Sequence, residues 1–219
     1  DDTINLGAGT DYVVGGIGGD LIRDLGDGNT SPDVIFGDHA QIKFRVAVAG
    51  DTTPVILAAR SAFVGFGGDD TINTTNGADI IVGGAGTDTI TSDGGNDIIA
   101  GDNAYVTGFM DASVGAALIS LVLAQTMAAT IGARDTINIG TGGAIVFGGA
   151  GDDQINTDVS GMLDAADILF GDHGRARFAT PDVDTSQLIA VLIESTDTLF
   201  GGDDEITSGS GVEHATDVG

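Results

Sequence analysis

The chain has 219 residues, of which 37 are Gly, 3 are Pro and none is Cys. Its 33 acidic and 7 basic residues give a formal net charge of −26, which excludes a nucleic-acid binder because such a protein needs a basic surface. The missing Cys excludes a disulfide framework, and a hydrophobic content of 42% excludes a chain that is disordered simply because it is acidic.

The first element in the chain is a short motif, Asp2-Thr-Ile-Asn5, that returns at long intervals. It recurs as Asp70–Asn73 and Asp135–Asn138, and a related copy begins at Asp204, so the spacings are 68, 65 and 69 residues. A fixed long period is the signature of a repeat architecture. We therefore predict one continuous solenoid made of units 1–68, 69–134 and 135–202 and a truncated unit, 203–219.

Each unit contains four shorter turns, in which an Asp is followed two positions later by an aliphatic residue. Side chains alternate across a strand, so one aliphatic residue between polar neighbours points into a narrow core. Two turns of about nine residues then complete one circuit between two facing sheets. The aspartates of the turns are Asp2, Asp11, Asp20, Asp33, Asp70, Asp79, Asp88, Asp97, Asp135, Asp153, Asp167 and Asp204. The second turn of the third unit has Ala144 where an acid is expected.

The odd and even turns of each unit differ in the residues that flank the buried aliphatic position. Odd turns such as Thr71-Ile-Asn73 have polar flanks, whereas even turns such as Ile80-Ile-Val82 are apolar throughout. Parallel strands that are apolar at every position are covered on both faces. We therefore expect the odd sheet to face water and the even sheet to carry a further layer.

An irregular insert closes each unit, at about 39–61, 103–130 and 173–195, after a shared Gly-Asp-His or Gly-Asp-Asn. Each insert contains two apolar stretches and is the natural cover for the even sheet, although a neighbouring molecule could provide that cover instead. The second stretch reads as a strand in 188–193 and equally well as a helix in 116–129. The longest apolar run, Ala116–Ala124, is too short for the ~20 residues that cross a bilayer, so no membrane insertion is expected.

The loops before three of the odd turns have the form Gly-Gly-x-Gly-x-Asp, as in Gly83-Gly-Ala-Gly-Thr-Asp88. Glycine adopts positive φ freely, so a tight loop can turn its carbonyl oxygens inward, and Ca²⁺ is bound by six to eight oxygens. An array of aspartates one strand spacing apart is repulsive without a cation. The alternative is that each Asp only forms a turn with its own backbone. The glycines of the three loops are Gly15, Gly16, Gly18, Gly83, Gly84, Gly86, Gly148, Gly149 and Gly151.

These three error-free nonapeptides and the partial copies around them resemble the RTX (repeats-in-toxin) calcium-binding nonapeptide family. The resemblance implies an all-β fold, a right-handed parallel β-roll or β-solenoid, with the insert closing each unit. It also implies that the loop glycines and the aspartates of the turns bind several Ca²⁺ ions. Same-side aspartates 18 residues apart, such as Asp70 with Asp88, are expected to share ions, whereas the Ala144–Asp167 position is expected to be weak or empty.

Other candidate residues remain open. Asp38, Asp102 and Asp172, in the tripeptide before each insert, could bind calcium or cap a turn. His39 and His173 hold equivalent positions, but Asn103 replaces them in the second unit, which favours a polar turn role over acid–base chemistry. No nucleophile or zinc motif is present and calcium-bound carboxylates are poor proton donors, so we do not expect an enzyme.

The function expected from these features is structural: a calcium-stabilised segment of a large secreted or cell-surface bacterial protein, such as an adhesin stalk, a matrix component or a filament subunit. Extracellular calcium would fill its sites, and further copies of the repeat are expected partners because the sequence begins and ends within the repeat. The alternative is the calcium-binding tail of a secreted toxin or hydrolase with its catalytic domain elsewhere.

Overall fold

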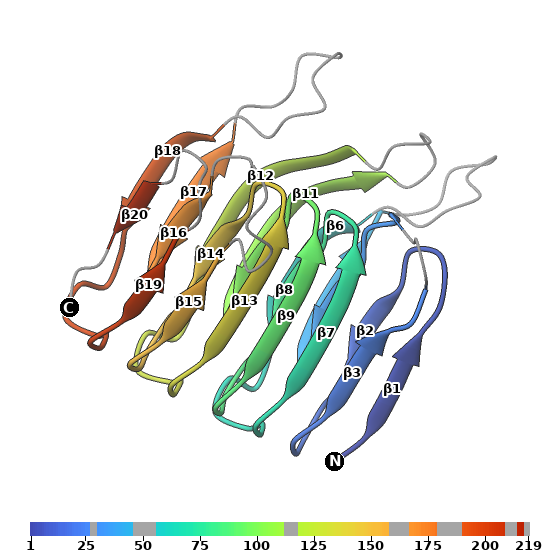
Figure 1. The fold of residues 1–219 in the computed structure, drawn as a ribbon, viewed down its shortest axis with the longest axis horizontal. Helices are drawn as coiled ribbons and strands as arrows, with labels where there is room; N and C mark the ends of the chain where they lie inside the picture. Colours follow the sequence, from blue (N-terminus) through green and yellow to red (C-terminus); the bar gives the residue numbers. More distant parts are fainter. Residues whose placement is uncertain are drawn as a thin grey trace.

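The fold is described from a computed structural model, in which the described secondary-structure elements are all β-strands and form three sheets (Figure 1). No helix that could cross a membrane occurs in the part of the chain that the structure describes. The described residues are 1–26, 30–45, 56–111, 118–157, 167–178, 190–208 and 214–216, so parts of the predicted inserts, including 46–55, 112–117 and 179–189, lie outside them.

The first sheet contains the odd turns of every unit, and all of its strands are parallel. Equivalent repeat positions stand side by side: Ile4 pairs with Ile22, Ile22 with Ile72, and Ile72 with Ile90. In order, its strands are β1 (Thr3–Leu6), β3 (Leu21–Asp24), β7 (Thr71–Asn76), β9 (Thr89–Gly94), β13 (Thr136–Thr141), β15 (Gln154–Asn156) and β19 (Glu205–Thr207).

The second sheet contains the even turns and is also parallel, with Val13 beside Ile35 and Ile35 beside Ile81. Outside the inserts, successive strands alternate between the two sheets, as expected for a solenoid with two turns per circuit. In order, its strands are β2 (Tyr12–Val14), β4 (Val34–Phe36), β8 (Ile80–Val82), β10 (Ile98–Ala100), β14 (Ile145–Phe147), β16 (Ile168–Phe170) and β20 (His214–Thr216).

A narrow aliphatic core lies between these two sheets. The residue two positions after each Asp points into it: Ile22, Ile72 and Ile90 come from the first sheet, and Ile35 and Ile81 from the second, all with no exposed surface. Burying an aliphatic side chain of this size contributes about 1.5–3 kcal/mol. The alternation predicted from the sequence is therefore present, and the all-β parallel roll is confirmed.

The third sheet is antiparallel and is made from the inserts. Each insert contributes a hairpin, and the hairpins of successive units pair edge to edge, so one sheet runs across all three units (Figure 1). β12 is a strand, which decides between the helix and strand interpretations of that stretch. In order, the strands are β18 (Ala190–Ser195), β17 (Gly174–Phe178), β12 (Leu118–Thr126), β11 (Ala104–Asp111), β6 (Ile56–Ser61) and β5 (Ala40–Phe44).

The third sheet covers the outer face of the second. Phe36, Phe147 and Phe170 point outward from the second sheet and are buried in a core shared with hairpin residues such as Val106 and Phe178. The rings of Phe147 and Phe170 stack with their centroids 4.8 Å apart. Of the two covers that the sequence left open, the structure therefore has the inserts of the same chain on the even sheet, which explains the apolar flanks of the even turns.

Candidate metal centre

Loops join the first and second sheets along two edges of the roll. Along one edge, which we call the Gly-Gly edge, the chain passes from the second sheet to the first. It contains the uninterrupted loops 15–20, 83–88 and 148–153, which alternate with the three loops that the inserts interrupt. Along the opposite edge the chain passes from the first sheet to the second, through loops that end at residues 11, 33, 79, 97, 144 and 167. The loops 77–79, 95–97 and 142–144 are shorter than the Gly-Gly loops.

The aspartates of the Gly-Gly edge form a continuous ladder of hydrogen bonds. In each rung, one carboxylate oxygen, Oδ1, accepts the backbone N–H of the aspartate in the preceding turn. The rungs, written from donor to acceptor, are Asp2 to Asp20 (2.6 Å), Asp20 to Asp70 (2.7 Å), and Asp70 to Asp88, Asp88 to Asp135, Asp135 to Asp153 and Asp153 to Asp204 (each 2.8 Å).

Sequence reasoning found only half of these neighbours. It paired aspartates 18 residues apart, such as Asp70 with Asp88, and the structure places those side by side. It missed the rungs that bridge an insert, such as Asp20 with Asp70 and Asp88 with Asp135, in which the partners are 50 and 47 residues apart. The shared Asp-x-aliphatic phase on both sides of each insert was the signal that could have revealed them.

The second carboxylate oxygen, Oδ2, is the feature of the Gly-Gly edge that points to a cation. It is buried and accepts no hydrogen bond in five aspartates: Asp20, Asp70, Asp88, Asp135 and Asp153. Leaving a buried charged acceptor unsatisfied is costly, and calcium prefers carboxylate and carbonyl oxygens.

A backbone carbonyl oxygen lies beside these unpaired carboxylate oxygens. A Cβ added to Gly83 would lie 2.3 Å from Asp88 Oδ2 and 2.3 Å from the Gly101 carbonyl oxygen. A Cβ on Gly15 would similarly lie 2.4 Å from Asp20 Oδ2 and 2.1 Å from the Gly37 oxygen. A side chain at either glycine would fill the space between two oxygens of the kind that calcium binds, so the residues fit the ion.

Loop glycines adopt the positive-φ backbone conformation that was expected of them from the sequence. In the uninterrupted loops the second and fourth positions have positive φ, for example +127° at Gly84 and +136° at Gly86. An L-residue with a side chain rarely adopts these angles, so the loop shape requires glycine at both positions.

Burial and mutual repulsion make this edge electrostatically unfavourable without a cation. Burial, with the neighbouring Asp70, Asp38 and Asp69, raises the pKa of Asp88 to about 8. Burial and the neighbouring Asp102 and Asp88 raise the pKa of Asp135 to about 10. In the described part of the chain no three acidic or histidine side chains converge on one point, so a calcium ion here would need backbone carbonyls besides carboxylates.

The opposite edge has a similar ladder with a gap. The N–H groups of Asp11, Asp33 and Asp79 donate to Oδ1 of the next aspartate, over 2.8, 2.8 and 2.9 Å. At the fourth rung Ala144 offers no carboxylate to Asp97, although its own N–H donates to Asp167 Oδ1 over 2.8 Å. The Ser92 hydroxyl donates to Asp97 Oδ2 over 2.6 Å, so that oxygen already has a partner.

The aspartates before the inserts also lie on the Gly-Gly edge, although their role was left open by the sequence. Asp38 accepts the N–H of Ala85 over 2.5 Å and that of Gly68 over 3.2 Å. Asp102 accepts the Ala150 N–H over 2.5 Å, and Asp172 accepts the Gly202 N–H over 2.9 Å. Each of them therefore binds a backbone amide of a different loop segment.

His173 and Asn103, which follow two of these aspartates, have the polar turn role that was expected. The buried His173 ring approaches the Ala129 carbonyl oxygen, with Nε2 3.0 Å away. The Asn103 side-chain amide donates to the Val64 carbonyl over 3.4 Å. Both residues therefore connect one unit to the preceding unit, at the end of its insert or just after it. The His39 ring instead packs edge to face on the Phe63 ring.

Comparison with known protein families agrees with this geometry. The profile of the RTX calcium-binding nonapeptide repeat matches the chain in four copies, over residues 1–22, 64–99 and 139–159. Each of these segments contains one of the three uninterrupted Gly-Gly loops in full. Neither the comparison with curated proteins nor that with solved structures finds a match.

Proposed function

We propose that this chain, which carries RTX calcium-binding nonapeptide repeats, is a calcium-stabilised structural segment of a large secreted or cell-surface bacterial protein. In such a protein it would serve as an adhesin stalk, a matrix component or a filament subunit. The observation that carries the proposal is the ladder of buried aspartates whose Oδ2 atoms lack hydrogen-bond partners. RTX repeats are structural calcium-binding repeats, and nothing in this proposal requires catalysis by the chain itself.

The proposed ligands are the aspartates of the turns and the backbone carbonyls of the glycine loops that were named from the sequence. On the Gly-Gly edge, Oδ2 of aspartates such as Asp88 and carbonyl oxygens such as that of Gly101 would hold the ions. Calcium would supply the positive charge that lets neighbouring carboxylates stay ionised. The Ala144–Asp167 position, with one carboxylate fewer, would be weaker or empty.

An extracellular location follows from the strength expected of such sites. Extracellular calcium modules have Kd values of about 10⁻⁴–10⁻³ M, so they fill in millimolar calcium and not inside a cell. At a calcium concentration about tenfold above Kd, each filled site stabilises the fold by about 1.4 kcal/mol. Several such sites together are comparable to the ~5–15 kcal/mol stability of an ordinary domain.

Circular dichroism with and without calcium tests the proposal. We expect the strand signal to be largely lost in chelator and regained on adding millimolar calcium, while atomic emission of dialysed protein finds several ions per chain. Magnesium is the control cation because it demands near-octahedral geometry and gives up its water reluctantly. An unchanged strand signal in chelator, with no bound calcium, would contradict the proposal.

The alternative, a calcium-binding tail of a toxin or hydrolase, is less well supported. The hairpin sheet continues across all three units, so the inserts are a regular part of the architecture. Short tails need only nonapeptide turns. The parent reading frame distinguishes the two: many further units of this length favour the structural role, and an adjoining catalytic domain favours the tail.

A further inference from the structure

Each loop that an insert interrupts contains an additional aspartate that the uninterrupted loops lack. In the second unit this loop begins with Gly101-Asp102 and ends at Asp135, on the far side of the insert. The Asp102 N–H donates to the Gly148 carbonyl over 3.3 Å, just as the Gly84 N–H donates to Gly101 over 2.9 Å. Asp102 therefore occupies the place of the second glycine of an uninterrupted loop.

Asp102 has an oxygen that no protein group satisfies. Its side chain has no exposed surface, and only Oδ2 accepts a well-formed hydrogen bond, from Ala150. Oδ1 is buried without a partner in hydrogen-bonding geometry, although the nearby Ala133 amide lowers the pKa of the group somewhat. A residue that served only to cap a turn would not require this second, buried oxygen.

The carboxylate of Asp135 lies beside the segment that contains Asp102. A Cβ added to Gly101, the residue before Asp102, would lie 2.2 Å from Asp135 Oδ2 and 2.7 Å from the Gly148 carbonyl oxygen. Asp102 is in turn the neighbouring charge that most raises the pKa of Asp135, whose Oδ2 also lacks a hydrogen-bond partner. A divalent cation is the simplest group that satisfies both orphaned oxygens and reduces the repulsion.

We propose that Asp102 is an additional calcium ligand, at a position that only an interrupted loop provides. The equivalent Asp38 differs, because each of its carboxylate oxygens accepts a backbone N–H. The inference rests on the proposed calcium-binding function and adds a ligand outside the aspartate position of the nonapeptide. An ion bound by both Asp102 and Asp135 ties the start of the insert to its end. Calcium then closes the loop that carries the β11–β12 hairpin and offsets part of the entropy of loop closure.

The Asp102→Asn variant separates calcium binding from capping. Asn keeps a carbonyl oxygen that can accept the Ala150 N–H, but it lacks the charge and the second oxygen that the ion would use. We expect calorimetric titration to show one site lost or weakened about tenfold or more, because ligand charge tunes calcium affinity. The luminescence lifetime of bound Tb³⁺ should shorten, since water replaces the lost oxygen.

Asp93→Asn is the matched control, because Asp93 is an exposed residue of β9 and the substitution changes the net charge equally. Affinity, ion number and Tb³⁺ lifetime that are the same in Asp102→Asn, Asp93→Asn and the unmodified chain would overturn the inference. If Asp102→Asn does not fold, Asp102→Ser, which also removes the charge and the second carboxylate oxygen, provides the same measurement. A chain that folds without binding calcium refutes the proposed function itself, which is a different result.

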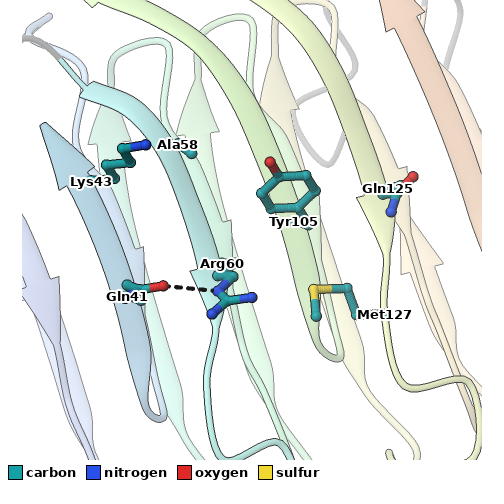
Figure 2. A pocket seen from close by; sticks show the side chains of 7 residues that line it. All are labelled: Gln41, Lys43, Ala58, Arg60, Tyr105, Gln125 and Met127. Carbon is teal, nitrogen blue, oxygen red and sulfur yellow. Dashed lines mark hydrogen bonds between the residues drawn. The ribbon is translucent and has the colours of Figure 1, made fainter. Parts of the chain in front are cut away.

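A separate observation concerns the outer face of the third sheet, where five of the seven basic residues of the chain fall on the hairpins or beside them. A hollow of about 310 Å³ on this face lies between the hairpins of the first and second units. Figure 2 shows Lys43, Arg60, Tyr105 and Gln125 around it, and Arg60 Nε donates to Gln41 Oε1 over 3.0 Å. No acidic residue lines the hollow, although the chain has 33.

The chemistry of this hollow suits one kind of ligand. Two cations attract an anionic group, two side-chain amides offer hydrogen bonds to hydroxyls, and an aromatic ring can stack on the face of a sugar. The volume is at the low end for small-ligand sites, about the size of one or two sugar rings. We infer that the hollow binds an acidic sugar unit, as in a uronic-acid polysaccharide, which would give the proposed structural role an adhesive surface.

Titration with trigalacturonate at constant free calcium tests this binding, with neutral trigalactose as the control ligand. We expect saturable binding of the acidic trimer only, weakened several-fold by Arg60→Gln. Arg23→Gln, an exposed arginine of β3 in the first sheet, should leave binding unchanged. The inference fails if trigalacturonate does not saturate, or if Arg60→Gln instead suppresses self-association in sedimentation, which would make this face a contact between copies.

Discussion

The two loop edges of the roll use the same aspartate ladder but leave different atoms available. On both edges, Oδ1 of one aspartate accepts the backbone N–H of the turn before it, as in Asp70 with Asp88 and Asp79 with Asp97. On the Gly-Gly edge Oδ2 of five aspartates, Asp70 and Asp88 among them, then has no partner, whereas on the opposite edge the Ser92 hydroxyl satisfies Oδ2 of Asp97. The opposite edge is not uniform, since Oδ2 of Asp11 has no partner.

The difference teaches that the ladder itself is structural and that the conformation of the loop decides where a cation fits. Uninterrupted Gly-Gly loops have two glycines with positive φ, such as Gly84 and Gly86, whereas the short loops of the opposite edge have at most one, such as Gly95 or Gly142. The Gly-Gly loop brings carbonyl oxygens beside the unpaired carboxylate oxygens. We therefore expect substitutions on the two edges to have different consequences, and the predictions that follow begin with the largest.

The largest effect is expected for Gly83→Ala on the Gly-Gly edge. The added methyl group would lie 2.3 Å from both Asp88 Oδ2 and the Gly101 carbonyl oxygen, so it would displace proposed ligands. We expect a loss of about 3 kcal/mol in the free energy of unfolding in calcium, measured by urea denaturation. Gly7→Ala is the control on the opposite edge, since no atom lies within 4 Å of its added methyl group.

A smaller effect on stability, with opposite signs in calcium and in chelator, is expected for Asp88→Asn. Asn can still accept the Asp70 N–H, so the ladder persists, but one buried charge is removed. Unfolding experiments should show about 1–3 kcal/mol less stability in calcium and a gain in chelator, because repulsion among the apo carboxylates falls. Asp97→Asn should change both values much less. A loss of the same size in both conditions would argue against a metal role for Asp88.

In the absence of calcium, a lower pH should stabilise the folded chain along both edges. Burial raises the pKa of Asp70, Asp33 and Asp97 to about 7 each, well above the ordinary value of 3.8. A raised carboxyl pKa means that the folded state holds its proton more tightly, so this stabilisation is complete below about pH 4 and is lost as the pH rises through about 7. Circular dichroism in chelator should therefore show more strand at pH 5 than at pH 8. The opposite trend would refute the assignment of buried, coupled carboxylates.

The smallest effect is expected for Ala144→Asp, which fills the gap in the opposite ladder. The new Oδ1 could accept the Asp97 N–H and restore the missing rung, while its charge would destabilise the apo chain. Calorimetry should find at most one additional weak calcium site, since the loops 95–97 and 142–144 are shorter than the Gly-Gly loops. A new site as strong as those of the Gly-Gly edge would show that loop length does not set affinity.

The nonapeptide period was sufficient to predict much of the fold and part of the site. The spacing of acid and aliphatic residues predicts the parallel roll, the inward position of Ile72 and Ile81, and the neighbours Asp70 and Asp88. These features are local, since each depends on a strand period of two and on glycines within one loop. The apolar flanks of even turns also predict that a further layer covers the second sheet.

Other features were decided only by the tertiary structure. The stretch at 118–126 became the strand β12 because its neighbours β11 and β17 pair with it on either side, and sequence periodicity does not report such pairing. The hydrogen bond between Asp88 and Asp135 likewise joins residues on opposite sides of an insert. Asp102 and Asp135, at the two ends of the same interrupted loop, are also neighbours only in the folded chain. Sequence alone determined what each turn contains, whereas long-range hydrogen bonds and burial determined which turns meet and which oxygens remain without a partner.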